Sequence, residues 1–547
     1  MASEHRKKKN NFLVQGGILA LAGIIVRVIG LFYRVPMINI LGDEGSGIYS
    51  SAFNIYSILL LLSSSSLPLA ISKMIAERTS KGEFRNAGAV LRVSLIFSFF
   101  LGGATFCIVW FGSDFFASAV LHAPETAFAI RTLAPTIFIM AFLSTFRGFF
   151  QGLGTMIPTA VSQIIEQIFN AVFSIVCAWS LFNMGMAAEG GSEHLAAAWG
   201  AGGGTIGTGV GALSALGFVL FIWLIYRKRF NARVARDRTG SRESGLSILK
   251  IVVLSALPIM LSGTISNIST VLDQSFYGQY METAGLSDVY MSIWGSYSSI
   301  YVLLTTLPIA ISTALASSAA PSIASANVTG KKEELLSKIS SSIRFVMIIA
   351  LPSTVGLTVL SAPIVQMFFP IDNGTGAHML LVGSVVVVFA STMTITNAVL
   401  QGIGHMVLPL RNSAIALGAH VLFLLAALRM DTGIYGVMFA TIFFNIVITV
   451  LNMIDIHRLL GYRQELVRTV LLPLICSAVM GAACWLVREG VYLLLHSNML
   501  SVLAALVAAV IVYAVLLLLS RAVTEDELKT FPMGTRITGI AKRLRLM

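Results

Sequence analysis

Two arginines, Arg27 and Arg34, lie inside the first long apolar run of the sequence, in the stretch GIIVRVIGLFYRVP. A charged side chain at membrane depth costs roughly 3 kcal/mol, and it is retained only where it faces a protein interior or a wet cavity. On a helix, a separation of seven residues places both side chains on one face, about 10 Å apart. Because a guanidinium stays charged and grips phosphate oxygens with paired hydrogen bonds, this spacing favours an elongated phosphate-bearing anion. The alternative is that the arginines snorkel to lipid headgroups or only hold helices together.

A second set of polar residues lies in the apolar run near 158–182. At spacings of three and four, its members share one helical face, and they are Ser162, Gln163, Glu166, Gln167, Asn170 and Ser174. A helix surrounded by lipid would not carry such a face, so this face should pack against protein or line a cavity. Glu166 is the charged member. It would balance an arginine, cap a polar network, or hold a transported proton or cation.

The run near 248–277 repeats this pattern with Ser255, Ser262, Ser266, Thr270, Asp273 and Tyr277. Asp273 lies near the outer end, where it would either face the mouth of a cavity or be solvated at the membrane interface. Asn54 and Asn267 fit a cavity lining, although a hydrogen bond between helices is the commoner use of a lone membrane asparagine. Arg147 and Arg411 lie near the ends of their runs, where snorkelling explains them, or where they would guard an entrance.

The composition places these residues in a membrane protein. Hydrophobic residues make up 56% of the chain, charged residues 11%, and the mean hydropathy is +0.85, whereas a soluble domain has roughly 25% charged residues. Runs long enough to cross a hydrocarbon core of about 30 Å occur fourteen times, near 12–36, 48–72, 87–111, 127–149, 158–182, 197–226, 248–277, 291–316, 339–369, 378–400, 407–428, 433–456, 467–488 and 498–520. The predicted fold class is all-α and polytopic, with about 14 transmembrane helices.

The excess of positive charge, +12 net, lies in the short gaps between the apolar runs. Gaps after even-numbered runs are basic, with Arg78, Lys81, Arg85, the dense segment 227–242, Lys331, Lys332, Lys338, Arg458 and Arg463. Most gaps after odd-numbered runs hold only acidic and neutral residues, such as Asp43 and Glu44. The positive-inside rule then predicts a plasma-membrane protein with both termini in the cytoplasm. The basic tail Lys529–Arg545 would be solvated or lie on anionic lipid.

Two short segments recur along the chain. QGLGTMIP at 151–158 returns as QGIGHMVLP at 401–409, and LPLAIS at 67–72 returns as LPIAIS at 307–312. Both pairs are six runs apart, which predicts two similarly oriented six-helix halves and two appended helices. Parallel repeats of this kind are a transporter architecture, with the substrate held between the halves. The expected parts are an N-terminal lobe, a C-terminal lobe, and a C-terminal helix pair with the basic tail, at 1–235, 236–460 and 461–547.

The sequence lacks the motifs of common enzymes and metal sites. It has no Walker A loop, no G-x-S-x-G and no H-E-x-x-H, and its four cysteines and eight histidines do not have the spacing of metal ligands. We therefore expect no enzymatic activity, no cofactor, no metal and no nucleic-acid partner. Work would come from an ion gradient, the membrane potential or the gradient of the substrate itself.

An ordered set of motifs resembles a known transporter family. The motifs are RGFFQG at 147–152, PTAVSQ at 158–163 with Glu166 and Gln167, LPLAISK at 67–73, and Arg27-x-x-Gly30. They resemble the polysaccharide-transport branch of the multidrug/oligosaccharidyl-lipid/polysaccharide exporter superfamily, and within it the stage V sporulation protein B group of MurJ-type lipid II flippases. The resemblance covers essentially the whole chain. It implies two six-helix lobes in a V around a central cationic cavity, and alternating access that carries an undecaprenyl-diphosphate-linked sugar to the outer leaflet.

The resemblance also implies roles for particular residues. In that family, arginines of the first span contact the diphosphate, and Arg27 and Arg34 occupy comparable places. The Gram-negative branch carries further cavity arginines in its second and eighth spans, whereas 59–66 and 300–306 contain none here. Some relatives couple to sodium through the seventh, eleventh and twelfth spans, but the eleventh run here offers Asn412 and no carboxylate. No sodium site is therefore predicted.

These observations combine into one functional prediction. The chain would be a monomeric flippase for lipid II or a related lipid-linked glycan, with membrane lipids as its other partners and an unassigned coupling ion. The predicted substrate-binding residues are Arg27, Arg34, Asn54, Gln163, Glu166 and Asp273. The alternatives are a cation-coupled multidrug exporter, an exporter of another lipid-linked polysaccharide, and a non-transporting scaffold for cell-wall or spore synthesis.

Overall fold

The structure is a computed structural model that describes residues 2–65, 67–188, 190–328, 332–369 and 374–520. Within the helices, the side chains of 2–17, 20, 24, 31, 65, 256–263, 265, 266 and 328 lie outside this description. The described residues form helices joined by short connections and contain no strand. The all-α polytopic fold class is therefore confirmed.

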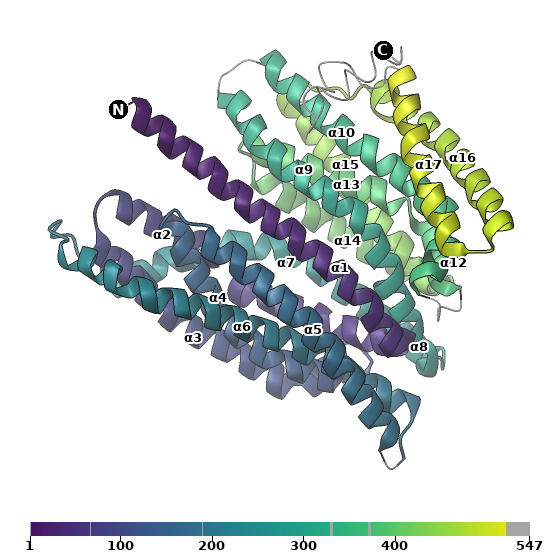
Figure 1. Ribbon diagram of the computed structural model, residues 1–547, viewed down its shortest axis with the longest axis horizontal. Helices are drawn as coiled ribbons and strands as arrows, with labels where there is room; N and C mark the ends of the chain where they lie inside the picture. Colours follow the sequence, from purple (N-terminus) through teal and green to yellow (C-terminus); the bar gives the residue numbers. More distant parts are fainter. Residues whose placement is uncertain (1, 66, 189, 329–331, 370–373, 521–547) are drawn as a thin grey trace. The chain divides into compact units, whose positions relative to one another are not determined.

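The chain forms two compact units, Met1–Gly295 and Ser296–Met547. The helices of the first unit are α1 (Ala2–Leu60), α2 (Leu67–Ser80), α3 (Phe84–Phe115), α4 (Ala127–Gly152), α5 (Ile157–Ala187), α6 (Glu193–Ala235), α7 (Gly245–Thr283) and α8 (Ser287–Gly295) (Figure 1). A π-helical turn, Leu61–Ser65, follows α1 directly. These units have a different boundary from the predicted lobes, whose arrangement stays a prediction.

The fourteen predicted apolar runs all lie on helices. Among the described residues, eleven helices are long and apolar enough to cross a membrane, or up to twelve if one bent pair counts as a single span. This count is lower because the first two runs, on the helical stretches ahead of and after Gly42, are counted together as one candidate. In addition, the seventh run lies on α7, of which Gly245–Ser255 is the described apolar part.

Helix α1 is interrupted at Gly42, whose backbone angles are φ 66° and ψ −175°. A residue with a side chain would be strained at this φ, so glycine is the residue that permits the kink. The polar residues Asp43 and Glu44 predicted a connection here, and it is reduced to Gly42, after which a second helical stretch begins at once. Arg27 and Arg34 therefore lie on the helical stretch of α1 ahead of Gly42, and Asn54 lies on the stretch after it.

Helices α5 and α6 pack with their backbones in close contact. A methyl group added to Gly207 would lie 2.1 Å from the backbone nitrogen of Ser174, and one added to Gly211 would lie 2.5 Å from the carbonyl oxygen of Glu166. Glycines four residues apart on one helical face allow this approach, as in other membrane helix pairs. One side of α5 is therefore fixed against α6.

The core of the first unit lies where α2, α3, α4 and α6 meet. Ile71 and Ile75 of α2, Val90 of α3 and Phe149 of α4 are fully buried there. The ring of Phe149 meets that of Trp223 edge to face, with centroids 5.0 Å apart. Such aromatic pairs add to the stabilisation that burial alone provides.

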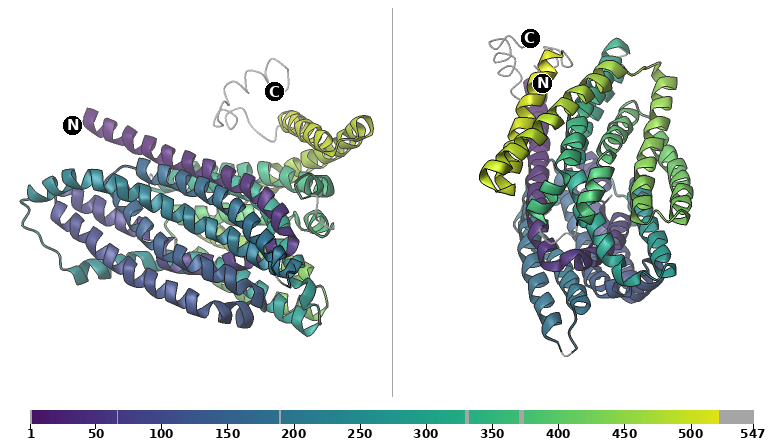
Figure 2. Two further views of the ribbon diagram at one scale, coloured as in Figure 1. Left: turned by 60° about the horizontal axis from the view of Figure 1, so that its bottom comes forward. Right: turned by 90° about the vertical axis from the view of Figure 1, so that its right-hand side faces the viewer.

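The second unit has its own helices and core. Its helices are α9 (Val302–Val328), α10 (Lys332–Val359), α11 (Ser361–Phe368), α12 (Thr375–Gly383), α13 (Val386–Gly402), α14 (Val407–Arg429), α15 (Ile434–Leu460), α16 (Leu472–Leu495) and α17 (Asn498–Leu519). A π-helical turn, Ser296–Tyr301, precedes α9, and α12 and α13 form a pair bent by 54°. The last two helices run antiparallel and side by side at the yellow end of the colour scale (Figure 2).

Buried aliphatic side chains of α9, α10, α13 and α15 form the core of this unit. They include Ile323, Ile339, Val346, Val399 and Ile456, all fully buried. The predicted basic tail, Lys529–Arg545, lies outside the described residues.

Candidate functional site

The polar face of α5 meets a buried arginine from α4. The Nε of Arg147 donates to the hydroxyl of Ser162 at 2.9 Å, and its Nη2 donates to the carboxylate of Glu166 at 2.7 Å. The Arg147 side chain is 9% exposed and that of Glu166 is 26% exposed. Each charge therefore compensates the other where water is scarce. The prediction that Glu166 balances an arginine is confirmed, and the snorkelling explanation of Arg147 is wrong because its guanidinium is buried.

Further along α5, the same face contacts α1. The amide of Asn170 donates to the phenol of Tyr33 at 3.5 Å, and the oxygens of Tyr33 and Tyr49 are also 3.5 Å apart. Ser174 donates to Asn170 at 2.8 Å, which orients the asparagine amide. One turn earlier on α1, Gly30 lies against the Gln167 side chain. Ser174 also donates to the backbone carbonyl of Gly204 on α6 at 2.7 Å. The predicted polar face of α5 is therefore turned toward protein, on α1, α4 and α6.

The arginine pair lies on α1 beside these tyrosines. Both Arg27 and Arg34 are exposed, while Tyr33 and Tyr49 are buried. The phenols of both tyrosines are electrostatic neighbours of the Arg34 guanidinium. Arg27 and Arg34 belong to the same helical stretch of α1, ahead of Gly42, so their separation of seven residues places them two turns apart on one face.

Asn54 forms a hydrogen bond between helices. Its amide donates to Gln274 of α7 at 2.9 Å, and Gln274 in turn donates to the hydroxyl of Ser51. The phenol of Tyr290 donates to the backbone carbonyl of Gln274 at 3.2 Å. Gln274 thus joins α1, α7 and α8. Sequence reasoning overlooked it, although its position next to Asp273 was a signal.

The remaining predicted residues have different surroundings. Asp273 on α7 is only 4% exposed, so the prediction that it is solvated at the interface is wrong. Gln163 is half-buried on α5. Ser262 and Ser266, which belong to the predicted polar pattern of α7, have side chains outside the described residues.

A separate polar network lies in the second unit. Arg411 of α14 forms an ion pair of 2.7 Å with Asp455 of α15, and Asn412 donates to Asp455 at 2.8 Å and to Asn452 at 2.9 Å. Snorkelling alone therefore does not explain Arg411. Sequence reasoning overlooked Asp455 and Asn452, although their spacing of three residues placed them on one face of α15.

Metal binding has no structural support in the part of the chain that is described. No group of three or more His, Cys, Asp or Glu side chains in that part could hold a metal ion. The carboxylates of Glu166 and Asp455 are instead bound to arginines. Both arrangements hold helices together and neutralise charge at depth.

Two known proteins of Bacillus subtilis (strain 168) are similar to this chain along most of its length. The first, "Lipid II flippase MurJ", is 25% identical over 492 residues, which cover 86% of this chain and 87% of that protein. The second, "Stage V sporulation protein B", is 23% identical over 534 residues, which cover 97% of this chain and 99% of that protein.

Solved structures show the same fold. "Lipid II flippase MurJ, inward closed conformation" matches with a TM-score of 0.61 and 13% identity over 91% of this chain and 98% of that chain. A structure of a multidrug resistance MATE family transporter of the MOP superfamily, in an inward-facing conformation, matches with a TM-score of 0.64 and 19% identity over 80% of this chain and 94% of that chain. At these identities the likeness concerns the polytopic membrane fold alone.

A protein family matches across the first part of the chain. The family described as "Polysaccharide biosynthesis protein" matches residues 13–327, which is more than half of the chain. This segment includes the arginine pair, the polar face of α5 and the repeated LPLAIS and LPIAIS motifs. The resemblance drawn from the motifs is confirmed at this level: the chain is a multi-pass membrane protein of the polysaccharide biosynthesis family.

Proposed function

We propose that this protein moves a polyprenyl-diphosphate-linked glycan, lipid II or a close relative, from the inner to the outer leaflet by alternating access. The observation that carries the proposal is the pair of exposed arginines, Arg27 and Arg34, two turns apart on an apolar helix. A diphosphate spreads its negative charge over two phosphorus centres. Two guanidiniums in line match that shape better than a single cation would.

The surroundings of the pair favour an anion. The nearby carboxylate of Glu166 is already bound to Arg147 at 2.7 Å, so its charge does not cancel that of the α1 arginines. The phenols of Tyr33 and Tyr49 lie close to Arg34, and they would donate hydrogen bonds to phosphate oxygens. In this proposal, Glu166 holds Arg147 and thereby the contact between α4 and α5. It does not act directly on the arginines that bind the diphosphate.

The other proposed site residues would shape the site around the phosphates. Asn54 fixes α1 against α7 through Gln274, and its rotation would expose an amide to the sugar. Gln163 is half-buried one turn before Glu166 and would donate or accept a hydrogen bond to the glycan. Asp273, buried on α7, would act on the site through the packing of that helix.

The test is flipping of fluorescent lipid II by the purified protein in liposomes. Arg27→Gln and Arg34→Gln each remove one charged hydrogen-bond donor, so each should lower the flipping rate at limiting substrate by roughly tenfold or more. Arg131→Gln is the matched control because Arg131 pairs with Asp114 at 2.8 Å near the solvent-exposed end of α4. It should leave the rate within about twofold.

The same liposomes separate the alternatives. If both α1 variants remain folded and flip lipid II at the wild-type rate, the diphosphate grip is wrong. Transport of a cationic dye that is unaffected by the two substitutions would indicate a multidrug exporter. Failure to move either substrate, together with failure to rescue cells depleted of their own lipid II flippase, would favour a scaffold.

A further inference from the structure

A second cationic site lies in the first unit, away from the α1 arginines. A cavity of about 680 Å³ is lined by α3, by the end of α6 and by the segment that joins α6 to α7. Three arginines contribute to its wall: Arg85 and Arg92 of α3, and Arg242 of the joining segment. Arg85 and Arg92 are seven residues apart, so they lie on one face of α3.

The side chains that line this cavity carry more positive than negative charge. In the described part of the chain, Arg92 and Arg242 take part in no ion pair. The backbone N–H of Arg85 donates a hydrogen bond to the carboxylate of Asp237. The one carboxylate in the wall, Glu243, is bound to the buried guanidinium of Arg78. Glu243 therefore does not neutralise the arginines that face the cavity.

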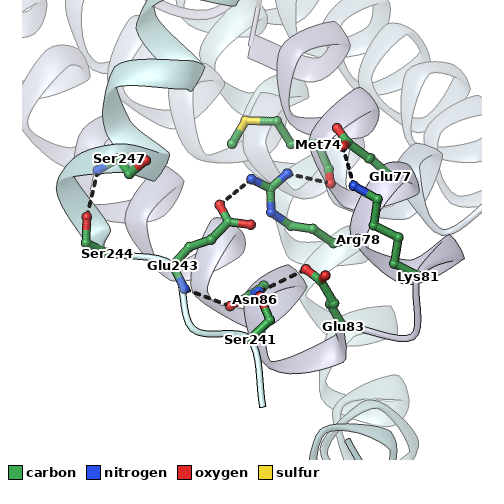
Figure 3. Close-up of polar contacts among 10 residues, drawn as sticks. All are labelled: Met74, Glu77, Arg78, Lys81, Glu83, Asn86, Ser241, Glu243, Ser244 and Ser247. Carbon is green, nitrogen blue, oxygen red and sulfur yellow. Dashed lines mark hydrogen bonds and ion pairs between the residues drawn. The ribbon is translucent and has the colours of Figure 1, made fainter. Parts of the chain in front are cut away.

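The wall formed by the joining segment is fixed in place. Figure 3 shows Glu243 reaching Arg78, and Asn86 lying between Glu83 and Ser241. The backbone N–H of Glu243 donates to Asn86 at 3.2 Å. These contacts tie the segment to the α2–α3 turn and hold the neighbouring Arg242 at the cavity.

The earlier part of the joining segment is anchored as well. The carboxylate of Asp237 accepts from the hydroxyl of Thr239 at 2.6 Å and from the backbone N–H of Arg85 at 2.8 Å. The bond from Thr239, followed by that from Arg85, lowers the pKa of Asp237 to about 2. Asp237 is therefore ionised at neutral pH, and the anchor is intact there.

The cavity lies where apolar surface gives way to charged surface. On α6, Leu224 and Ile225 are more than half exposed, whereas Arg227, Lys228 and Arg229, which follow Tyr226, are exposed and basic. This change marks the level of lipid headgroups. The cavity floor contains Trp223 and the buried Phe230, so cationic groups adjoin an apolar surface.

We propose that this cavity binds an anionic phospholipid, with the phosphate between Arg85, Arg92 and Arg242 and the first part of an acyl chain against Trp223. Basic pockets between helices at the headgroup level recognise lipids by this combination of charge and apolar contact. A soluble phosphate would use the arginines but not the apolar floor. The proposal is independent of the transported substrate.

The test measures lipid binding to the purified full-length protein by native mass spectrometry, with phosphatidylglycerol and phosphatidylcholine as probes. Wild type should bind phosphatidylglycerol at least roughly tenfold more tightly. Removing one arginine near the surface should weaken binding of phosphatidylglycerol about fivefold. The triple variant Arg85→Gln/Arg92→Gln/Arg242→Gln should weaken it roughly a hundredfold. The control Arg227→Gln/Lys228→Gln/Arg229→Gln removes the same charge from the same end of α6 outside the cavity wall, and it should change binding less than about threefold.

Other outcomes would overturn the proposal. Equal losses in the two triple variants would reduce the effect to general surface charge, and equal binding of the two lipids would remove the phosphate preference. If millimolar inorganic phosphate or ADP displaced phosphatidylglycerol and bound as tightly as the lipid does, the cavity would be assigned to a soluble anion. Should the cavity triple variant not fold, Arg92→Gln alone decides the matter, because Arg92 is exposed and its loss should still weaken binding about fivefold.

Discussion

Arg147 and Glu166 each place a charge within the helices of the first unit, and each is tolerated because the other is present. Their side chains meet at 2.7 Å with little exposure. Removing one partner would leave the other as an uncompensated charge, which costs about 3–5 kcal/mol when the site is fully buried. The cost here should be lower, because a quarter of the Glu166 side chain still reaches solvent.

We expect Glu166→Gln to destabilise the protein by about 2 kcal/mol, since the Arg147 guanidinium loses its counter-charge. The measurement is the thermal unfolding midpoint of the purified protein in detergent. Glu77→Gln is the matched control, because Glu77 pairs with Lys81 at 2.8 Å with both side chains more than half exposed. Such pairs contribute about 0–1 kcal/mol.

A double substitution sharpens the test of this ion pair. Arg147→Met combined with Glu166→Leu removes both charges, so it should recover much of the stability that Glu166→Gln loses. If Glu166→Gln and Glu77→Gln lowered the midpoint equally, the ion pair would have no special structural role.

Sequence reasoning found one side of these contacts more easily than the other. The spacing of Ser162, Glu166 and Asn170 is visible along one helix, so their shared face was predictable. Their partners were not, because Arg147 and Tyr33 come from other helices whose packing is set by the tertiary fold. The same reason explains why Gln274 was overlooked as the partner of Asn54.

At the scale of elements, the glycine stripe of α6 sets the position of α5. Gly207 and Gly211 bring the backbone of α6 against Glu166, Asn170 and Ser174 of α5, and the side chains of Glu166 and Asn170 also carry contacts to α4 and α1. A side chain at either position would push α5 outward. The polar face would then lose its alignment with Arg147 and Tyr33.

Two alanine substitutions on α6 should have effects of opposite sign. Gly207→Ala would place a methyl group 2.1 Å from the Ser174 backbone nitrogen, so it should destabilise the protein by about 1–3 kcal/mol through overpacking. Gly217→Ala meets nothing within 4 Å, so it should stabilise the helix by up to about 1 kcal/mol through propensity. Thermal midpoints measured side by side would check this; a gain in stability for Gly207→Ala would show that the two helices separate easily.

The elements themselves were largely predictable because apolar runs of about 20 residues are long-range signals. The length of the joint between the first two runs was not. Asp43 and Glu44 are typical of a connection, but a single glycine with positive φ at Gly42 was enough to turn the chain. Local polarity therefore predicts where two helices join better than how many residues the joint contains.

At the scale of the whole molecule, the distribution of charge gives the chain its direction. Basic gaps follow the even-numbered apolar runs, and the densest of them, 227–242, lies between α6 and α7. Acidic residues such as Asp43, Glu44 and Asp114 lie at the opposite ends of the helices. The positive-inside rule orients a chain by this bias in its short connections.

We therefore expect the segment between α6 and α7 to face the cytoplasm. Arg236 and Arg238 are exposed there, so trypsin should cut this segment in inverted membrane vesicles and leave it intact in right-side-out vesicles. The connection between α5 and α6, 188–192, contains no lysine or arginine, and a protease site inserted there should show the opposite accessibility. Cutting of both segments in the same vesicles would contradict the predicted topology. The reverse pattern, with the α6–α7 segment cut only in right-side-out vesicles, would move the proposed lipid-binding cavity, with its three arginines, to the outer leaflet, so the two cuts together decide in which leaflet its lipid resides.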